Sequence, residues 1–527
     1  MELRNPEQPR AVLVPDPVPG ISEASAAARS EEQLATATAR IVGVVSGMKL
    51  RNPELLRAVP AWVVLRQLGQ VLRDTSSDPA KLYSLSEQVP FIKEFWSHSW
   101  HGSRFMKIWL LLVLKNGCPA VCVGILVAFL AAFLSYLDIL PGWYKVHYSG
   151  EFKHSPWAMV SGVVASLVTL LLWRPGGPVF LDRVCIHQGD EVLKSQAILQ
   201  LGAFLKSSRT LVVVWDPTYL SRLWCVFELA AFFHSHKADG RSKLVIKHVA
   251  LAPFMCFMVT QTAVMMVLEI CLPTSDLFLL VRVVYVCGVT VLFTHFLVKF
   301  WHDVAVAEQQ FRRFSWHAVT CECCAANHRA ANGNRIPCDR VILEKCVVRW
   351  FGSVEALEAC VRNKICDTFV AQVSGGFPFG YFWLVGGNFG VWYGHADFFA
   401  ARMHGGDRWY AASLLVTTVA WWLWVVPTNH LIFSRVARWM QRKQQEKLSA
   451  PVLYAVKCAG YFANIVNSNI PFLYQGGCYT VLGDPVLAAV VFAGTALLFA
   501  ALSYQWLANP THGSVLPCLK NPSSLKT

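Results

Sequence analysis

The sequence predicts a multipass α-helical membrane protein that carries one α/β domain, and this domain is interrupted by a pair of membrane spans. Only 15% of the 527 residues are charged and 54% are hydrophobic, whereas a soluble domain usually carries about 25% charged residues. Several apolar runs reach the length of about 20 residues that a membrane helix needs. Between residues 90 and 251, short apolar strands alternate with helical segments, which is typical of a parallel sheet covered by helices.

The N-terminal region, residues 1–82, is predicted to be mostly flexible. It begins with charged residues and prolines and lacks the apolar run of a secretory signal. A short motif occurs twice, as ELRNPEQPRAV at 2–12 and KLRNPELLRAV at 49–59. Two copies are too few for a solenoid, which needs about three repeats, so no function is assigned to the motif.

Eight apolar segments are candidate membrane spans, and their spacing pairs them as four hairpins. The hairpins occupy residues 107–173, 250–300, 379–434 and 452–508. The stronger candidate spans are Pro119–Leu137, Pro156–Trp173, Ala250–Leu272, Leu277–Val298, Trp409–Phe433 and Pro485–Leu507. The two weaker ones are Phe379–Phe399 and Val452–Tyr474. The expected partner of these helices is a lipid bilayer.

The distribution of charge predicts which side the soluble segments occupy. The formal net charge is +14, and the linker 435–451 is rich in arginine and lysine, which favours the cytoplasmic side of a membrane. Because hairpins return to the side they leave, the soluble segments and both termini, including the tail 509–527, are expected to be cytoplasmic. The basic residues are not interleaved with aromatic residues, so nucleic-acid binding is not expected. Seventeen scattered cysteines fit a reducing compartment.

Residues 84–104 and 175–250 are expected to build the α/β domain. FWSHSWHG, FLDRVCIHQGDEV and SSRTLVVVWDPTYLSRLWCVFEL resemble, in this order, the three boxes of the TIR (Toll/interleukin-1 receptor-like) domain. The resemblance implies a flavodoxin-like parallel sheet. The chain departs from the family between the first two boxes, where the hairpin 107–173 intervenes. Two spans return the chain to the same side, so the fold survives, with the start of the first span replacing the first helix of the family.

Glu228 is the only acid in an otherwise apolar helical segment. In enzymatic TIR domains the glutamate at this place serves cleavage of NAD, and a carboxylate can stabilise the oxocarbenium-like ribose that the departing nicotinamide leaves. Trp224 and Glu228 lie four residues apart, on one helix face. The resemblance also makes Ser97, Asp182 and Asp190 candidates for holding NAD as substrate; the two aspartates equally fit a role in shaping their loop.

A structural interpretation of Glu228 stands beside the catalytic one. Buried acids are rare unless they are paired, and Arg222, Arg183 and Arg209 are the candidate partners. Three functions therefore remain open. The first is a membrane-anchored TIR-like signalling or assembly module that associates with itself or with TIR-like partner proteins. The others are an NAD-cleaving enzyme, and a channel or transporter that the TIR-like domain regulates.

The segment 301–376 is rich in cysteine and predicted to be cytosolic. Cys321, Cys324, His328 and Cys338 lie within twenty residues and can complete a tetrahedral zinc site. Cys323 is surplus to this set. Palmitoylated cysteines and unligated thiols are the alternatives. The following stretch, 353–369, has the apolar periodicity of a helix that packs against the TIR-like domain or the membrane surface.

Overall fold

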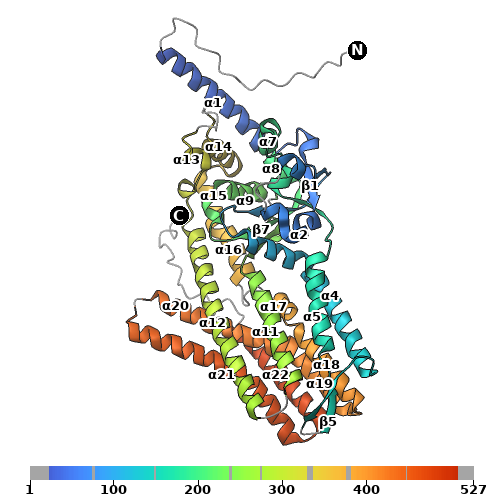
Figure 1. Cartoon of the computed structure of the whole chain (residues 1–527). Helices are drawn as coiled ribbons and strands as arrows, with labels where there is room; N and C mark the ends of the chain where they lie inside the picture. The colour runs from blue at the N-terminus through green and yellow to red at the C-terminus, as the bar shows by residue number, and fades with distance from the viewer. Residues whose placement is uncertain are drawn as a thin grey trace, which may run out of the picture.

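The chain forms two halves stacked along one long axis (Figure 1). The computed structural model describes residues 23–73, 78–147, 150–236, 240–272, 276–328, 336–374, 381–446 and 448–507. The α/β half and the Cys-rich segment lie at one end, and a bundle of long helices forms the other end. This is the division into an α/β part and a helical part that the sequence predicts.

The sheet of the α/β half has six strands in the order β2-β1-β6-β3-β7-β8. The strands are β1 (Arg57–Pro60), β2 (Glu87–Gln88), β3 (Ile92–His98), β6 (Pro178–Phe180), β7 (Ser208–Trp215) and β8 (Leu244–His248). Strands β6, β3, β7 and β8 run parallel, whereas β1 is antiparallel to both neighbours. In chain order the parallel strands are the second, first, third and fourth, which is the flavodoxin-like order. The expected parallel sheet is present, with an antiparallel extension.

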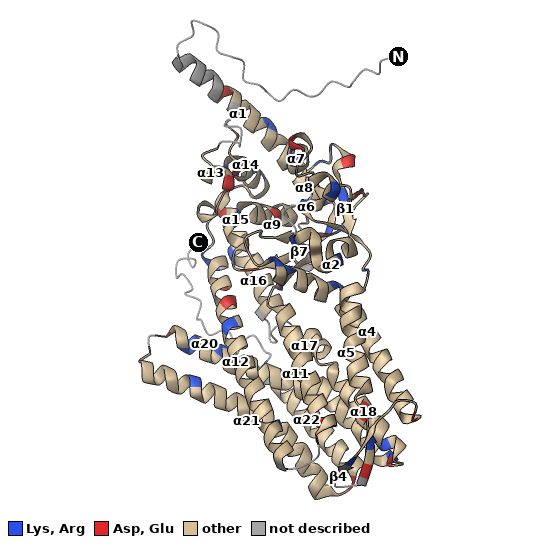
Figure 2. Ribbon diagram, in the orientation of Figure 1, with Lys and Arg blue, Asp and Glu red and all other residues tan. Residues whose placement is uncertain are grey.

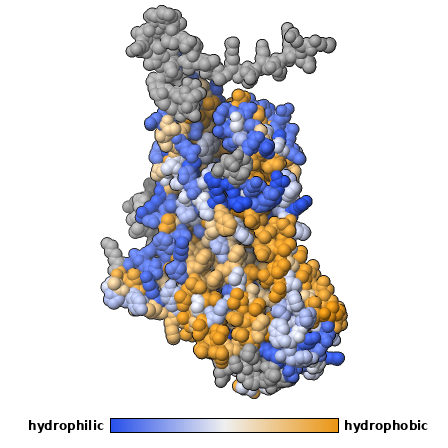
Figure 3. Space-filling model, in the orientation of Figure 1, coloured by the Kyte–Doolittle hydropathy of each residue, from blue (hydrophilic) through white to orange (hydrophobic). Residues whose placement is uncertain are grey.

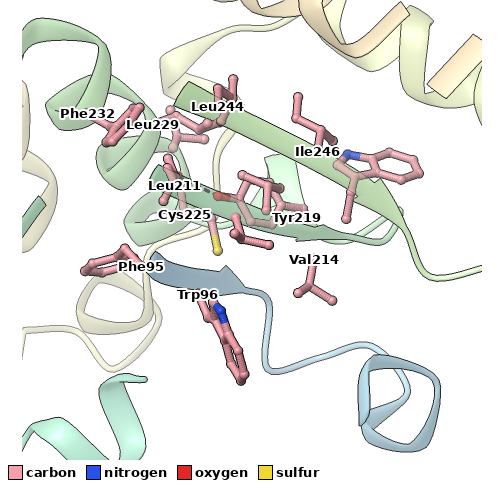
Figure 4. Close-up of a cluster of buried hydrophobic side chains, with 14 of the residues drawn as sticks. Phe95, Trp96, Leu211, Val214, Tyr219, Cys225, Leu229, Phe232, Leu244 and Ile246 are labelled. Atoms are coloured by element: carbon pink, nitrogen blue, oxygen red, sulfur yellow. Dashed lines mark hydrogen bonds between the residues drawn. The ribbon is translucent and has the colours of Figure 1, made fainter. Parts of the chain in front are cut away.

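Helices cover both faces of this sheet, and β3 shows which helix meets which face. Successive side chains of a strand point to opposite faces. Ser97 meets α9 (Leu223–Ser235), while Trp96 lies near Lys115 of α4 on the other face. Figure 4 shows Cys225 of α9 on the opposite side of β3 from Trp96. The shorter helices here are α6 (Asp182–Cys185), α7 (Glu191–Leu199), α8 (Leu201–Lys206), η2 (Tyr219–Ser221) and α10 (Gly240–Lys243).

Residues 53–73 belong to the α/β half, although the sequence predicts a flexible region over 1–82. Strand β1 pairs with β6 in the sheet, and its Val59 is fully buried. Helix α2 (Ala61–Arg73) packs against α4. The prediction fails because β1 is only four residues long, too short for a strand pattern to be seen in the sequence. The neighbouring short helices are η1 (Pro53–Leu55) and α3 (Pro79–Tyr83).

The second copy of the repeated motif is anchored to the α/β half by Gln200. The side-chain oxygen of Gln200 accepts hydrogen bonds from the main-chain N–H groups of Arg51 (2.8 Å) and Asn52 (2.9 Å). Helix α1 (Glu23–Gly47) precedes this contact. The first copy, within residues 1–22, lies outside the described residues.

Helix α4 (Arg104–Tyr136) is shared by the two halves. Its first turns pack into the α/β core through Ile108 and Leu111, in the place that the sequence predicts for the first helix of the domain. Lys107 of this part forms an ion pair with Asp216 at the end of β7, with 2.7 Å between Nζ and Oδ2, and both side chains are about 5% exposed. The helix then continues past Pro119 into the bundle.

A helical hairpin lies between β3 and β6 in the chain. After α4, strands β4 (Trp143–His147) and β5 (Gly150–His154) form an antiparallel pair at the far end of the bundle (Figure 1). Helix α5 (Trp157–Leu172) then returns along α4 and leads into β6. The chain therefore leaves the sheet after β3 and re-enters it at the neighbouring strand.

Five described segments are long and apolar enough to cross a membrane. They are Arg104–Tyr136, Leu251–Cys271, Leu277–Arg312, Arg408–Gln445 and Pro485–Gln505. Helices also occupy the other three expected spans. Helix α5 has only 16 residues, a short break divides one expected span into α17 and α18, and α21 is less apolar than the five segments above. The bundle helices are α11 (Leu251–Cys271), α12 (Asp276–Arg312), α17 (Tyr381–Gly387), α18 (Gly390–His404), α19 (Arg408–Ala420), η6 (Trp421–Val425), α20 (Val426–Gln445), α21 (Ala450–Leu482) and α22 (Pro485–Leu507).

Charge and hydropathy divide the surface of the bundle into zones. Figure 2 shows a long stretch of ribbon with few charges between the charged α/β half and a second charged zone around β4. The same stretch is predominantly hydrophobic on the visible surface (Figure 3). A hydrophobic belt between two polar ends is consistent with the five segments being membrane spans. The predicted basic linker 435–451 instead continues α20 as a helix up to Gln445.

The Cys-rich segment packs against the α/β half and shares its hydrophobic core, as the sequence allows. The side-chain amide of Gln372 accepts a hydrogen bond from the N–H of Ile246 (2.8 Å) and donates one to the carbonyl of Leu244 (2.7 Å). These bonds close the β8 edge of the sheet. The elements of the segment are η3 (Trp316–Ala318), α13 (Glu322–Ala325), α14 (Asp339–Phe351), α15 (Val354–Cys360), η4 (Val361–Ile365), α16 (Cys366–Phe369) and η5 (Val370–Ser374).

Candidate functional site

Glu228 lies at the carboxyl end of β3, where α9 crosses the sheet. The hydroxyl of Ser97, near the end of β3, donates a hydrogen bond to Oε2 of Glu228. The phenol oxygen of Tyr219 lies 2.5 Å from the same Ser97 oxygen, and either hydroxyl can be the donor of this bond. The three side chains form one hydrogen-bonded chain, Tyr219 to Ser97 to Glu228.

The carboxyl group of Glu228 is enclosed by protein, although the residue as a whole keeps some exposure to solvent. Ser97 and Tyr219 are fully buried, whereas Glu228 has intermediate accessibility. Burial raises the pKa of Glu228 to about 8; the hydrogen bond from Ser97 opposes this rise, and the nearby negative charge of Asp182 adds to it. At neutral pH the group is therefore mainly protonated, unlike an ordinary surface glutamate.

The other predicted site residues divide into two groups. Ser97 and Asp182 lie close enough to Glu228 to influence its proton, and Asp182 itself accepts a hydrogen bond from the indole of Trp100 (3.0 Å). Asp190 instead caps α7, because its carboxylate accepts the N–H groups of Val192 and Leu193 at 2.9 and 3.0 Å. The loop-shaping interpretation therefore accounts for Asp190.

Trp224 makes its contacts with the Cys-rich segment and within α9. Its indole N–H lies 3.4 Å from Oδ2 of Asp339 on α14, and its ring packs edge-on against Phe227. The Cys-rich segment thus covers the Trp224 side of α9.

The predicted ion pair of Glu228 with an arginine is wrong for the part of the chain that the structure describes. Arg222 lies at the start of α9 and pairs with Glu322 of the Cys-rich segment at 2.5 Å. Arg183 stacks over the ring of Trp100, and Arg209 stacks over that of Phe91. Ser97 therefore takes the place that the sequence assigns to an arginine.

Part of the chain matches a known protein family. The profile of the TIR domain family matches residues 180–254. Residues 180–254 form a TIR domain. The match begins at the last residue of β6 and so does not include β3, which the helical hairpin of α4 and α5 separates from it in the chain. No curated protein and no solved structure matches the chain.

A strand-like contact joins the TIR domain to the Cys-rich segment just before Trp224. The N–H of Thr320 donates to the carbonyl of Ser221 (2.7 Å), and the N–H of Leu223 donates to the carbonyl of Thr320 (3.1 Å). The Cys-rich segment is therefore bonded through its main chain to the first residue of α9.

The predicted metal ligands come together, with one exchange. Donor atoms of Cys323, Cys324, His328 and Cys338 lie within 4.8 Å of one another, whereas Cys321 falls in a separate group with Cys323 and Asp339. The sequence treats Cys323 as surplus and Cys321 as a ligand. In the structure it is Cys323, and not Cys321, that lies in the group of four.

The bundle contains a cavity of about 600 Å³, a volume in the range of small-molecule sites. Four of its lining residues carry charge: Lys145, Glu269, Arg282 and Arg402. Two of them, Glu269 and Arg282, approach each other, with 3.6 Å between Oε1 and Nε. This cavity does not include Glu228.

Tyr219 and Asp339 belong to the site but are not among the predicted residues. In the sequence Tyr219 is only part of a turn. No sequence pattern predicts that its hydroxyl contacts Ser97, which lies 122 residues away in the chain. Asp339 lies 115 residues from Trp224, so only the three-dimensional structure reveals their contact.

Proposed function

We propose that the TIR domain is an assembly module for signalling, held at a membrane surface by the helical bundle. TIR domains typically associate with one another. The observation that favours assembly over catalysis is the state of Glu228. Its carboxyl group completes an interior hydrogen-bonded chain, and its pKa of about 8 leaves it mainly uncharged at neutral pH. An uncharged carboxyl is poorly suited to stabilise a cationic transition state.

NAD cleavage is the second candidate, and the accessibility of Glu228 supports it. The carboxyl lies at the carboxyl end of the parallel strands, where ligands of such sheets bind. Among the described residues no ion pair neutralises it. In an enzyme of this kind Glu228 would have to lose its proton before it could stabilise the ribose cation, and Ser97 would orient it.

A measurement of NAD turnover separates the two candidates. The full-length protein in detergent is compared with Glu228→Gln at pH 7 and pH 9, with Glu322→Gln as a matched control on the exposed partner of Arg222. An assembly module gives no turnover that depends on Glu228. An enzyme instead gains rate as Glu228 loses its proton near pH 8, and Glu228→Gln costs about 30- to 1,000-fold in rate.

The orientation of the soluble segments follows from the hairpin scheme. We propose that the α/β half, the Cys-rich segment and the end of α20 lie in the cytoplasm, because of the basic residues of α20. Glycosylation acceptor sites inserted at Glu191, Gln444 and Lys153 test this in a eukaryotic expression host. Only the site at Lys153, at the far end of the bundle, is expected to be glycosylated. Modification at Gln444 would contradict the scheme.

A channel or transporter is the remaining candidate, and the cavity in the bundle favours it. Its charged lining residues carry three positive groups and one negative group among aromatic and methionine side chains. This combination fits a small anion that also carries an apolar part. Native mass spectrometry of the purified protein would show a molecule of this class bound, and Arg282→Met should reduce its retention.

A further inference from the structure

We propose that Cys323, Cys324, His328 and Cys338 bind one zinc ion, which fastens the Cys-rich segment to the start of α9. Cys323 and Cys324 lie on the short helix α13, and Cys338 immediately precedes α14. All four donor atoms lie within 4.8 Å of one another. Three thiols and one imidazole are the ligand set of a closed, four-coordinate structural zinc site.

The spacing of the donor atoms fits a metal ion better than a disulfide. The sulfur atoms of Cys324 and Cys338 lie 3.6 Å apart. Two thiolates at about 2.3 Å from one tetrahedral zinc ion are separated by about 3.8 Å. Cys321, Cys323, Cys324 and Cys338 form no disulfide. The thiols are thus already near the distances that zinc would impose.

The backbone and the imidazole of His328 both point to a ligand role. Asn327 and His328 adopt left-handed conformations, with φ of 52° and 55°, which non-glycine residues rarely do. This turn brings His328 back to the cysteines of α13, where its N–H bonds to the carbonyl of Cys323 (2.8 Å). Its Nε2 atom is buried and has no hydrogen-bond partner in the described chain. A bound cation would satisfy this nitrogen.

Burial argues against lipid attachment, the other interpretation of these cysteines. Cys323 is only 7% exposed, so an acyl chain on its sulfur would require the local fold to open. In Figure 1, α13 also lies at the end of the molecule that carries the sheet, far from the hydrophobic belt. Soft sulfur ligands and a closed site favour zinc over hard cations such as Mg²⁺.

The site is bonded to the TIR domain on both sides of the cluster. Thr320, three residues before Cys323, forms the main-chain bonds to Ser221 and Leu223. Asp339, next to Cys338, receives the indole N–H of Trp224. Zinc would hold α13 and the start of α14 together. It would therefore also hold the Cys-rich segment against the Trp224 side of α9. Loss of the metal should release that segment.

Zinc content of the purified full-length protein in detergent is the first test. We expect about one zinc ion per chain by elemental analysis, and a loss of about tenfold or more in Cys323→Ser and Cys338→Ser. Cys321→Ser is the matched control, because Cys321 is equally buried and lies 3.2 Å from Cys323, yet is outside the set of four. It should retain the metal. Protein that neither contains zinc nor takes up stoichiometric zinc would overturn the proposal, as would zinc loss from Cys321→Ser alone.

Hydrogen exchange tests the fastening role separately. Chelation of zinc should accelerate exchange of the amides of Thr320 and Leu223, while the amide of Val213 in the centre of the sheet stays protected. Cys323→Ser should show the accelerated exchange without chelation, and Cys321→Ser should not. Protection at Thr320 and Leu223 that is the same with and without zinc would contradict the proposed fastening. Cobalt substitution, which gives a sulfur-to-metal absorption band only with thiolate ligands, identifies the donor atoms independently.

Discussion

Glu228→Gln is expected to stabilise the protein at pH 8 by about 2–4 kcal/mol and to change it little at pH 4.5 or below. The ordinary pKa of a glutamate is 4.5, and burial raises that of Glu228 to about 8. Between these values the folded protein keeps a proton that the unfolded chain has released. The free energy of unfolding therefore falls as pH rises through this window. Glutamine does not titrate and still accepts the hydrogen bond from Ser97, so the fall should disappear.

Thermal unfolding in detergent at pH 5, 7 and 9 measures this effect. Glu322→Gln is the control, because Glu322 is 74% exposed and surface ion pairs contribute about 0–1 kcal/mol. Its unfolding curve should follow that of the unchanged protein at each pH. If Glu228→Gln were instead destabilising at pH 8, Glu228 would have a cationic partner and the structural interpretation with an arginine would return.

Lys107→Met is expected to cost about 3–5 kcal/mol, because it leaves the buried carboxylate of Asp216 without its counter-charge. Nζ of Lys107 lies 2.7 Å from Oδ2 of Asp216 and also donates to the carbonyl of Ser99. Adding Asp216→Asn should recover much of the loss, since the neutral amide has no charge to strand. Unfolding in denaturant, with the signal taken from tryptophan fluorescence, measures both variants.

Lys115→Met provides the comparison for this ion pair. Lys115 lies two turns further along α4 and pairs with Glu94, but their side chains are 19% and 16% exposed. Water reaches this pair more easily, so its loss should cost clearly less than that of Lys107. A cost below about 1 kcal/mol for Lys107→Met would show that Asp216 is not stranded by the change.

The sequence predicts the TIR domain and its interruption because both leave strong local patterns. The apolar strands β3 and β7 and the long apolar runs of α4 and α11 can be recognised from the local sequence alone, without knowledge of what packs beside them. β1 lacks such a pattern, because Arg57–Pro60 is four residues long and ends in proline, and it is a strand only because β6 lies beside it. This is why the predicted flexible region extends too far.

Side-chain direction explains the errors at the candidate site. The sequence shows that Arg222 lies near Glu228 in the chain, but not that the arginine turns outward to Glu322. Likewise, the C-x-x-C spacing of Cys321 and Cys324 favours Cys321 as a ligand, whereas in the structure Cys323 lies in one group with Cys324, His328 and Cys338. Residue types and distances along the chain indicate which segments contribute to each candidate site. Which side chains contact one another there depends on segments that are distant in the sequence.

The continuity of α4 fixes how the TIR domain can meet another copy. A domain on a flexible linker can rotate freely, but here a single helix both packs into the α/β core and is long and apolar enough to cross a membrane. A second rigid connection follows, because β8 ends at His248 and α11 begins at Leu251. The domain therefore cannot turn freely above the bilayer. In the membrane arrangement proposed above, two associating copies would approach by moving sideways in the plane of the bilayer, with their sheets held at a set tilt, and a rotation of α4 would turn the sheet with it.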